Sequence, residues 1–148
     1  MTIEKQINED IKSAMKARDS KKLAALRAIK AAMLLEKTKG ADMEIPDEVE
    51  LSIIQKLVKQ RKEAAELYTN QNRPDLAEEE AYQAGIIEAY LPEQMSEEDI
   101  RARVKEIIAQ TGAEGMKDMG KVMGLAAKAM QGLADNKVIS GIVRSELS

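Results

Sequence analysis

Cations near the C-terminus are the residues whose types and spacing suggest chemistry. Two predicted helices, over residues 117–130 and 135–147, each place Lys and Arg on one narrow stripe and apolar residues on the other side, at 100° per residue. Such cations bind phosphate groups through charge, so binding would depend strongly on salt and weakly on base sequence. The shape of folded RNA is therefore the expected target. The predicted RNA-binding residues are Lys117, Lys121, Gly124, Lys128, Lys137 and Arg144.

A glycine interrupts each basic row, Gly124 in the first and Gly141 in the second, and Gly120 lies close by on the first of these helices. Glycine inside a helix costs up to about 1 kcal/mol relative to alanine, so its presence calls for a reason. Two explanations stay open at this point. The glycines either let these short helices pack tightly against each other or let a phosphate approach the helix backbone.

A second group of cations lies in a predicted central helix over residues 21–39, which is apolar on most of its circumference. Arg27, Lys30 and Lys37 share a stripe with Leu23 and Leu34. Cations between apolar neighbours must reach water, pair with carboxylates or face a partner. We expect either pairing with the acidic middle of the chain or contact with a ligand, and Arg27 and Lys30 are the candidates for a second RNA contact.

Several kinds of catalysis are excluded by composition. The chain has no His and no Cys, which leaves no zinc site of the usual kind, no thiolate nucleophile and no side chain that titrates near neutrality without a perturbed pKa. The acidic run Glu78-Glu79-Glu80 points in three directions on a helix and is not expected to converge on a metal ion. The sequence therefore predicts no catalytic residue, no metal and no cofactor.

Charge is distributed unevenly along the chain. Residues 1–40 carry a net +5, residues 41–95 a net −8 and residues 96–148 a net charge of zero, within a total of −3. The first ten residues are too charged for a secretory signal, and no apolar run approaches the roughly 18 residues of a membrane span. We expect no membrane contact and a cytoplasmic location.

The elements that position these residues are predicted to be helices alone, because Ala, Leu, Lys, Glu and Met dominate. Pro46 and Pro74 are expected to open helices, Ser96 and Asp135 to cap them, and Gly112 to end one. Residues 41–45 are a predicted loop. The three tyrosines are expected in the core. The fold prediction is an all-α protein with an N-terminal four-helix domain, residues 1–92, and a three-helix C-terminal domain, residues 93–148.

Three short segments then suggest a family. They are Tyr90-Leu91-Pro92-Glu93-Gln94-Met95-Ser96-Glu97, Lys117-Asp118-Met119-Gly120-Lys121-Val122-Met123-Gly124, and Ala134-Asp135 before the last helix. Their order and spacing resemble the GatB/YqeY family, and the likeness spans the whole chain. Free-standing members of that family are similar to the tail of the B subunit of the tRNA-dependent aspartyl/glutamyl amidotransferase.

The resemblance implies a fold of two helical subdomains and a link to tRNA. The positions that match the family are Gly120, Lys121, Val122, Met123 and Asp135. The family is commonly filed under carbon-nitrogen ligase activity with glutamine as amido-N-donor. Within the amidotransferase, however, the likeness covers only the tail of the B subunit and not the parts that carry that chemistry. No turnover by this chain alone is therefore expected.

Two roles remain open from this resemblance. One is an accessory tRNA-binding module, with an aminoacyl-tRNA synthetase or an amidotransferase subunit as a further partner. The other is a protein-interaction adaptor that docks on such an enzyme without binding RNA, through the Ala-rich face of the second helix or the Met-rich face of the sixth.

Overall fold

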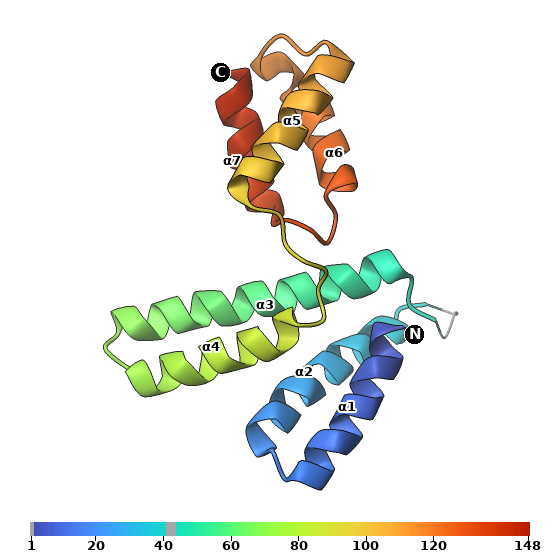
Figure 1. The fold of residues 1–148 in the computed structure, drawn as a ribbon, viewed down its shortest axis with the longest axis vertical. Helices are drawn as coiled ribbons and strands as arrows, with labels where there is room; N and C mark the ends of the chain where they lie inside the picture. The colour runs from blue at the N-terminus through green and yellow to red at the C-terminus, as the bar shows by residue number, and fades with distance from the viewer. Residues whose placement is uncertain (1, 41–43) are drawn as a thin grey trace. The chain divides into compact units, whose positions relative to one another are not determined.

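A computed structural model describes residues 2–40 and 44–148, and in this part of the chain all regular structure is helical (Figure 1). The predicted all-α class is confirmed. Part of the predicted loop at 41–45 lies outside the described residues. The elements are α1 (Ile3–Ala17), α2 (Ser20–Lys37), α3 (Asp47–Asn70), α4 (Pro74–Glu88), α5 (Glu97–Thr111), the 3-10 turn η1 (Met116–Asp118), α6 (Met119–Ala129) and α7 (Asn136–Leu147). None of the described helices is both long and apolar enough to cross a bilayer.

Local capping chemistry sets where several helices begin and end. The Ser96 side chain accepts a hydrogen bond from the Asp99 N–H at 3.1 Å, and Asp135 accepts one from the Lys137 N–H at 2.9 Å. Pro74 occupies the first turn of α4, and α5 ends at Gly112 with a φ of 70°. These predicted boundaries are confirmed.

The chain divides into two units, which we call unit 1 (Met1–Leu91) and unit 2 (Pro92–Ser148). Unit 1 consists of two helical hairpins, α1–α2 and α3–α4. Helix α2 packs against both helices of the second hairpin, α3 and α4. Its core is made of aliphatic side chains from all four helices: Ile7, Ala14, Ala25, Leu26, Ile29, Met33, Ile54, Val58 and Ile87.

Polar contacts tie α1 to the rest of unit 1. The Tyr90 hydroxyl donates to the Asp10 carboxylate. Burial raises the pKa of Tyr90 most, and this hydrogen bond raises it further. Lys30 donates to Asn8, and Lys37 forms an ion pair with Glu4. Lys30 and Lys37 thus bond to α1, and the charge of Lys37 also acts on Glu50 of the acidic middle segment. The expected pairing with that segment is wrong for Lys30, and the ion pair of Lys37 is with α1. The reason is that α1 packs directly along α2.

Glu50 is a buried carboxylate, with 2% of its surface exposed, at the start of α3. Its Oε2 atom accepts the N–H of Glu4 at 3.0 Å, so a side chain of α3 caps a first-turn amide of α1 across 46 residues of sequence. Burial raises the pKa of Glu50, and the charges of Asp47 and Glu4 act in the same direction, against the lowering by the Glu4 N–H and Lys37.

The raised pKa of Glu50 predicts a pH dependence of stability. The folded state holds this proton more tightly than the unfolded chain, so the favourable contribution is full below the ordinary value of 4.5 and is lost as pH rises through the folded pKa. Glu50→Gln keeps an acceptor for the Glu4 N–H without the buried charge. We expect the stability of Glu50→Gln relative to the parent to increase as pH rises from 4.5 to neutrality, as measured by urea unfolding across that range. A constant difference at every pH would contradict the assignment.

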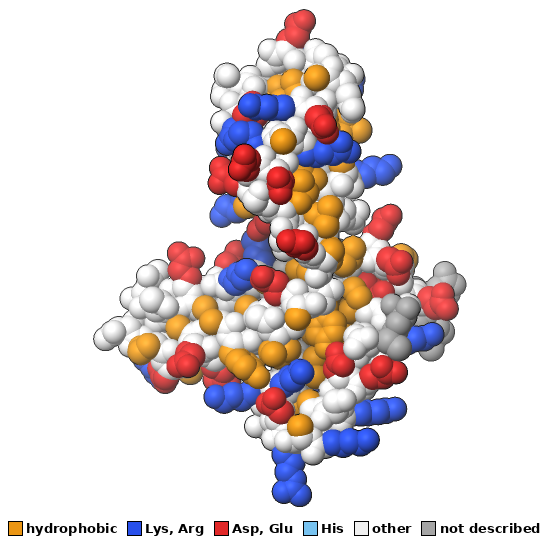
Figure 2. All heavy atoms as spheres, viewed as in Figure 1, with side chains coloured by type: hydrophobic (Ala, Val, Ile, Leu, Met, Phe, Trp, Pro, Cys, Tyr) orange, Lys and Arg blue, Asp and Glu red, His pale blue; other side chains and the backbone are white. Residues whose placement is uncertain are grey.

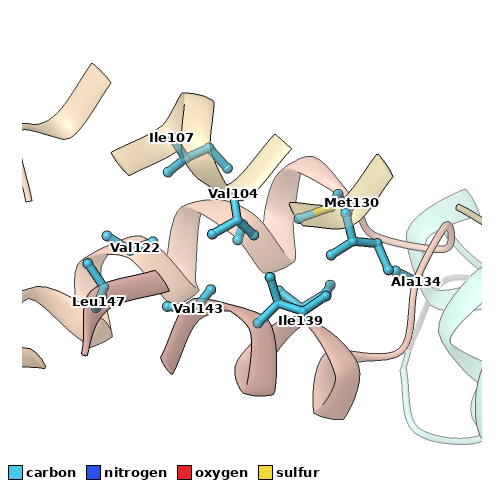
Figure 3. Packing of buried hydrophobic residues seen from close by; sticks show 11 residues of the cluster. Val104, Ile107, Val122, Met130, Ala134, Ile139, Val143 and Leu147 are labelled. Atoms are coloured by element: carbon cyan, nitrogen blue, oxygen red, sulfur yellow. The ribbon is translucent and has the colours of Figure 1, made fainter. Parts of the chain in front are cut away.

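Unit 2 is built from α5, α6 and α7 around one apolar core (Figure 3). The side chains of Val104, Val122, Ile139 and Val143 point toward one another from the three helices and are fully buried. The segment before α5 is fastened to the same unit, because the Met95 N–H donates to the Leu133 carbonyl at 2.9 Å and Gln94 Nε2 donates to the Gly132 carbonyl at 2.9 Å.

One core prediction fails. Tyr68 and Tyr90 are half-buried, but Tyr82 is 39% exposed. At the helical period of 100° per residue, Tyr82 lies on the other side of α4 from the buried Ala84 and Ile87. The prediction took Tyr82 to lie near an inward position of its helix, whereas the face of α4 that packs is formed by Ala77, Ala84 and Ile87.

Candidate nucleic-acid interface

The predicted stripe of the sixth helix lies on the solvent side of α6. Lys121, Gly124 and Lys128 are exposed, whereas Val122 and Ala126, on the opposite side, are fully buried in the core of unit 2. The periodic pattern therefore placed the cations of α6 correctly relative to the core.

The stripe on α7 has the same arrangement. Lys137, Gly141 and Arg144 are exposed, and Ile139 and Val143 are buried against α5 and α6. Both basic rows thus face away from the apolar core, as surfaces available to a ligand must. We call the exposed residues Lys121, Gly124 and Lys128 of α6 together with Lys137, Gly141 and Arg144 of α7 the C-terminal stripes.

The cations of the C-terminal stripes are not neutralised by the protein. Among the described residues, none of Lys121, Lys128, Lys137 and Arg144 forms an ion pair. Glu146, close to Arg144 in sequence, pairs instead with Arg101 of α5, and that bond raises the pKa of Arg101. These helix faces therefore present cations that are not held in ion pairs, although unit 2 as a whole is close to neutral, and such cations can contact phosphate.

Lys117 stands apart from the other predicted residues. It lies in the turn η1, before α6 begins, so the helical spacing that placed it on the stripe does not apply. Its ammonium group is 3.9 Å from the Glu114 carboxylate. Both side chains are largely exposed, and an ion pair of this kind contributes little.

The glycines in the basic rows face open space. A Cβ atom added at Gly120, Gly124 or Gly141 would meet no other atom within 4 Å. Tight packing between short helices, one of the two explanations considered for these glycines, therefore does not account for them. The space beside these glycines is open to a ligand.

The candidates for a second contact differ from each other. Lys30 is half-buried and hydrogen-bonded to Asn8, whereas Arg27 is exposed and, among the described residues, without an ion pair. Lys30 could contact a ligand only by giving up its bond to Asn8.

Other kinds of site are poorly represented. The described residues contain no group of three or more His, Cys, Asp or Glu that could hold a metal ion. Unit 1 has an open polar pocket of about 860 Å³ beside the start of α1, with Glu4, Lys5, Lys37 and Glu50 in its lining. Two of these carboxylates are already engaged, Glu4 by Lys37 and Glu50 by the Glu4 N–H.

Comparison with known proteins decides the family. The model of the Yqey-like protein family matches residues 4–147, almost the entire chain. The chain belongs to the Yqey-like protein family. This confirms the resemblance that the segments around Pro92 and Lys121 suggested.

Curated relatives come from fungi and are each named altered inheritance of mitochondria protein 41, mitochondrial. The protein of Pyrenophora tritici-repentis is 30% identical over 138 residues, which cover 91% of this chain and 75% of the relative. That of Meyerozyma guilliermondii is 29% identical, covering 84% of this chain and 66% of the relative. That of Kluyveromyces lactis is 30% identical, covering 69% and 56%. The chain thus spans between about half and three quarters of these relatives.

The names of these relatives correct one expectation. They are mitochondrial proteins, which contradicts the cytoplasmic location expected from composition. The expectation rested on charged residues at the start of the chain and on the lack of cysteine. Those features do not distinguish the cytoplasm from the interior of an organelle.

Proposed function

We propose that this chain is an accessory tRNA-binding protein whose C-terminal stripes bind the phosphate backbone of folded RNA. The observation that carries the proposal is the combination of unpaired cations and solvent-open glycines on one face of α6 and of α7. Glycine there weakens each helix without improving its packing, and beside unpaired cations it leaves room for a phosphate to approach the backbone, which supports the proposal.

The aromatic residues favour folded over single-stranded RNA as the ligand. Tyr68, Tyr82 and Tyr90 all precede unit 2, so the unit that carries the C-terminal stripes has no aromatic side chain. Proteins that bind single strands stack bases on aromatic rings, whereas duplex RNA is bound through its shape and backbone.

The two units have different parts in the proposal. Unit 2 is the three-helix domain that contacts RNA, and unit 1 is the four-helix domain that supports it or adds a second contact. The names of the relatives favour a mitochondrial setting for this function. Amidotransfer is not proposed for the chain alone, because the resemblance covers only the tail of the amidotransferase B subunit and not the parts that carry that chemistry.

A titration with unfractionated tRNA tests the proposal. Affinity of the full chain should fall steeply as salt increases. In the same titration Gly124→Ala should weaken tRNA binding several-fold, because the added methyl group holds the phosphate away. In thermal or urea unfolding the same change should stabilise α6 by up to about 1 kcal/mol, because the methyl group meets open space.

Gly85→Ala is the matched control. Gly85 is also a helical glycine that faces open space, but it lies on α4 in unit 1. It should stabilise the chain to a similar extent without changing tRNA binding. No binding at low salt by the parent chain would contradict the proposed function, and equal effects of the two alanines on binding would remove the role of Gly124.

A protein-interaction adaptor is the second candidate. It is favoured by two adjacent large apolar side chains on α2, Leu34 at 50% and Leu35 at 64% exposure. Recovery of a synthetase or amidotransferase subunit from nuclease-treated extract, together with its loss in Leu34→Asp with Leu35→Asp, would favour the adaptor over the RNA-binding protein.

A further inference from the structure

The turn between α1 and α2 carries a second, separate group of cations. Residues 11–35 contain seven Lys and Arg but only one acid, Asp19. The Asp19 carboxylate is already engaged, because it accepts the Lys22 N–H at 3.1 Å as the N-cap of α2. Figure 2 shows Lys and Arg side chains projecting from the end of this hairpin. We call the cations next to the turn the hairpin tip: Lys12, Lys16, Arg18, Lys21 and Lys22.

The hairpin tip is exposed and uncompensated. Four of its five side chains belong to exposed residues and Lys22 is half-buried, and within the described residues none of the five forms an ion pair. Cations elsewhere in unit 1 do find carboxylates, as Lys37 does with Glu4 and Lys62 with Glu88. The acidic character of α3 and α4 therefore does not neutralise this end of the α1–α2 hairpin.

Two cations of the hairpin tip stand where they weaken their own helix. Lys21 and Lys22 lie in the first turn of α2, which has no acid there. The partial positive charge of a helix N-terminus favours acids and repels cations. The first turns of α1, α3, α4 and α5 do contain acids, whereas those of α6 and α7, the helices of the C-terminal stripes, contain none.

Arg18 adds a conformational cost. It ends α1 in the left-handed region, with φ 56° and ψ 35°, where glycine fits best and a long side chain is disfavoured. Its charge suits the C-terminus of α1, but its backbone conformation does not suit an arginine. At three of five positions the sequence thus retains a cation against local structural preference, which is the pattern expected of a binding surface.

We propose that the hairpin tip is a second phosphate-binding surface, which contacts the backbone of RNA independently of the C-terminal stripes. RNA is favoured over a membrane because Met15 is the one large apolar side chain exposed in residues 3–30, too little to enter a bilayer. Residues 11–35 contain no aromatic ring for stacking on bases, so the contact is to phosphates and independent of base sequence.

Reversing two charges of the hairpin tip tests the inference. In the full chain, Lys21→Glu with Lys22→Glu should weaken binding of unfractionated tRNA by roughly 10- to 100-fold at about 0.1 M salt and lower the slope of log affinity against log salt by about 1–2. The same change should raise Tm by about 2–4 °C, because the new acids suit the helix N-terminus. Opposite changes in stability and binding are not expected of a purely structural role.

The control is Lys56→Glu with Lys105→Glu, which changes net charge equally at two exposed cations outside both surfaces. It should alter the affinity and the slope much less. If the tip variant binds tRNA like this control, the inference is wrong. It is also wrong if the variant keeps its RNA affinity but no longer binds vesicles of phosphatidylcholine and phosphatidylserine.

The two surfaces can fail separately. Substitution of the C-terminal stripes reports on the proposed function, and substitution of the hairpin tip reports on this inference, because the two lie in different units. Arg18→Gly provides a further test with Asn72→Gly as its control, since Asn72 is also left-handed, with φ 60°. Both should raise Tm, but only Arg18→Gly should weaken tRNA binding. Unchanged binding in Arg18→Gly would exclude Arg18 from the surface.

Discussion

Replacing Lys121 and Lys128 together by glutamate should weaken tRNA binding by roughly 50-fold at about 0.1 M salt, because two phosphate contacts are lost. The slope of log affinity against log salt should decrease by about 2. Both side chains are exposed and without ion pairs among the described residues, so no internal contact is broken. Filter retention of labelled tRNA at several salt concentrations measures both quantities.

The fold of this variant should be unchanged, with parental helicity by far-ultraviolet circular dichroism. Lys56→Glu with Lys105→Glu again serves as the control of equal charge. A stripe variant that retains tRNA as well as the parent at low salt would show that α6 is not the contact, whatever the hairpin tip does.

Truncating the core of unit 2 should have the largest effect on stability. Ile139 is fully buried among α5, α6 and α7, so Ile139→Ala removes apolar contacts and leaves a cavity, at a cost of about 2–5 kcal/mol. A unit this small has little stability in reserve. We expect unit 2 to unfold in the variant while unit 1 stays folded, and hydrogen exchange resolved by segment will distinguish the two.

Val138→Ala is the neighbouring control, because Val138 is 44% exposed and its truncation opens no cavity. It should leave exchange in both units close to that of the parent. Simultaneous loss of protection in units 1 and 2 on Ile139→Ala would mean that the chain folds as one cooperative whole, contrary to the proposed division into two domains.

Much of the fold could be predicted because its determinants are local. Ser96 and Asp135 cap the helices that follow them, and Gly112 ends α5, through contacts within a few residues. The outward position of the basic rows could also be predicted. The period of 3.6 residues assigns Lys121 and Val122 to different faces of one helix, and this assignment needs no knowledge of any other helix.

Contacts between helices could not be predicted in the same way. The bond of Glu50 to the Glu4 N–H and the pairing of Lys37 with Glu4 join residues far apart in sequence, and only the packing of α1 selects these partners. The reason for the glycines also required the structure, because only three-dimensional neighbours distinguish a packed glycine from an open one.

The hairpin tip shows a different limit. Lys12 and Lys16 read as an ordinary solvated face when their helix is considered alone. A count of charged residues over 11–35, which includes both helices and the turn between them, would have revealed the excess of positive charge. The predicted start of the helix at residue 21 already placed Lys21 and Lys22 in its first turn, against the helix dipole, and the structure keeps them there.

The position of the tyrosines has a consequence for spectroscopy. All three lie in unit 1, and Tyr90 is held there by its bond to Asp10. Tyrosine fluorescence and near-ultraviolet circular dichroism therefore report on unit 1 alone, and unit 2 has no aromatic chromophore. In the RNA-free chain an unfolding transition followed by tyrosine fluorescence is therefore that of unit 1, and one seen only by far-ultraviolet circular dichroism belongs to unit 2.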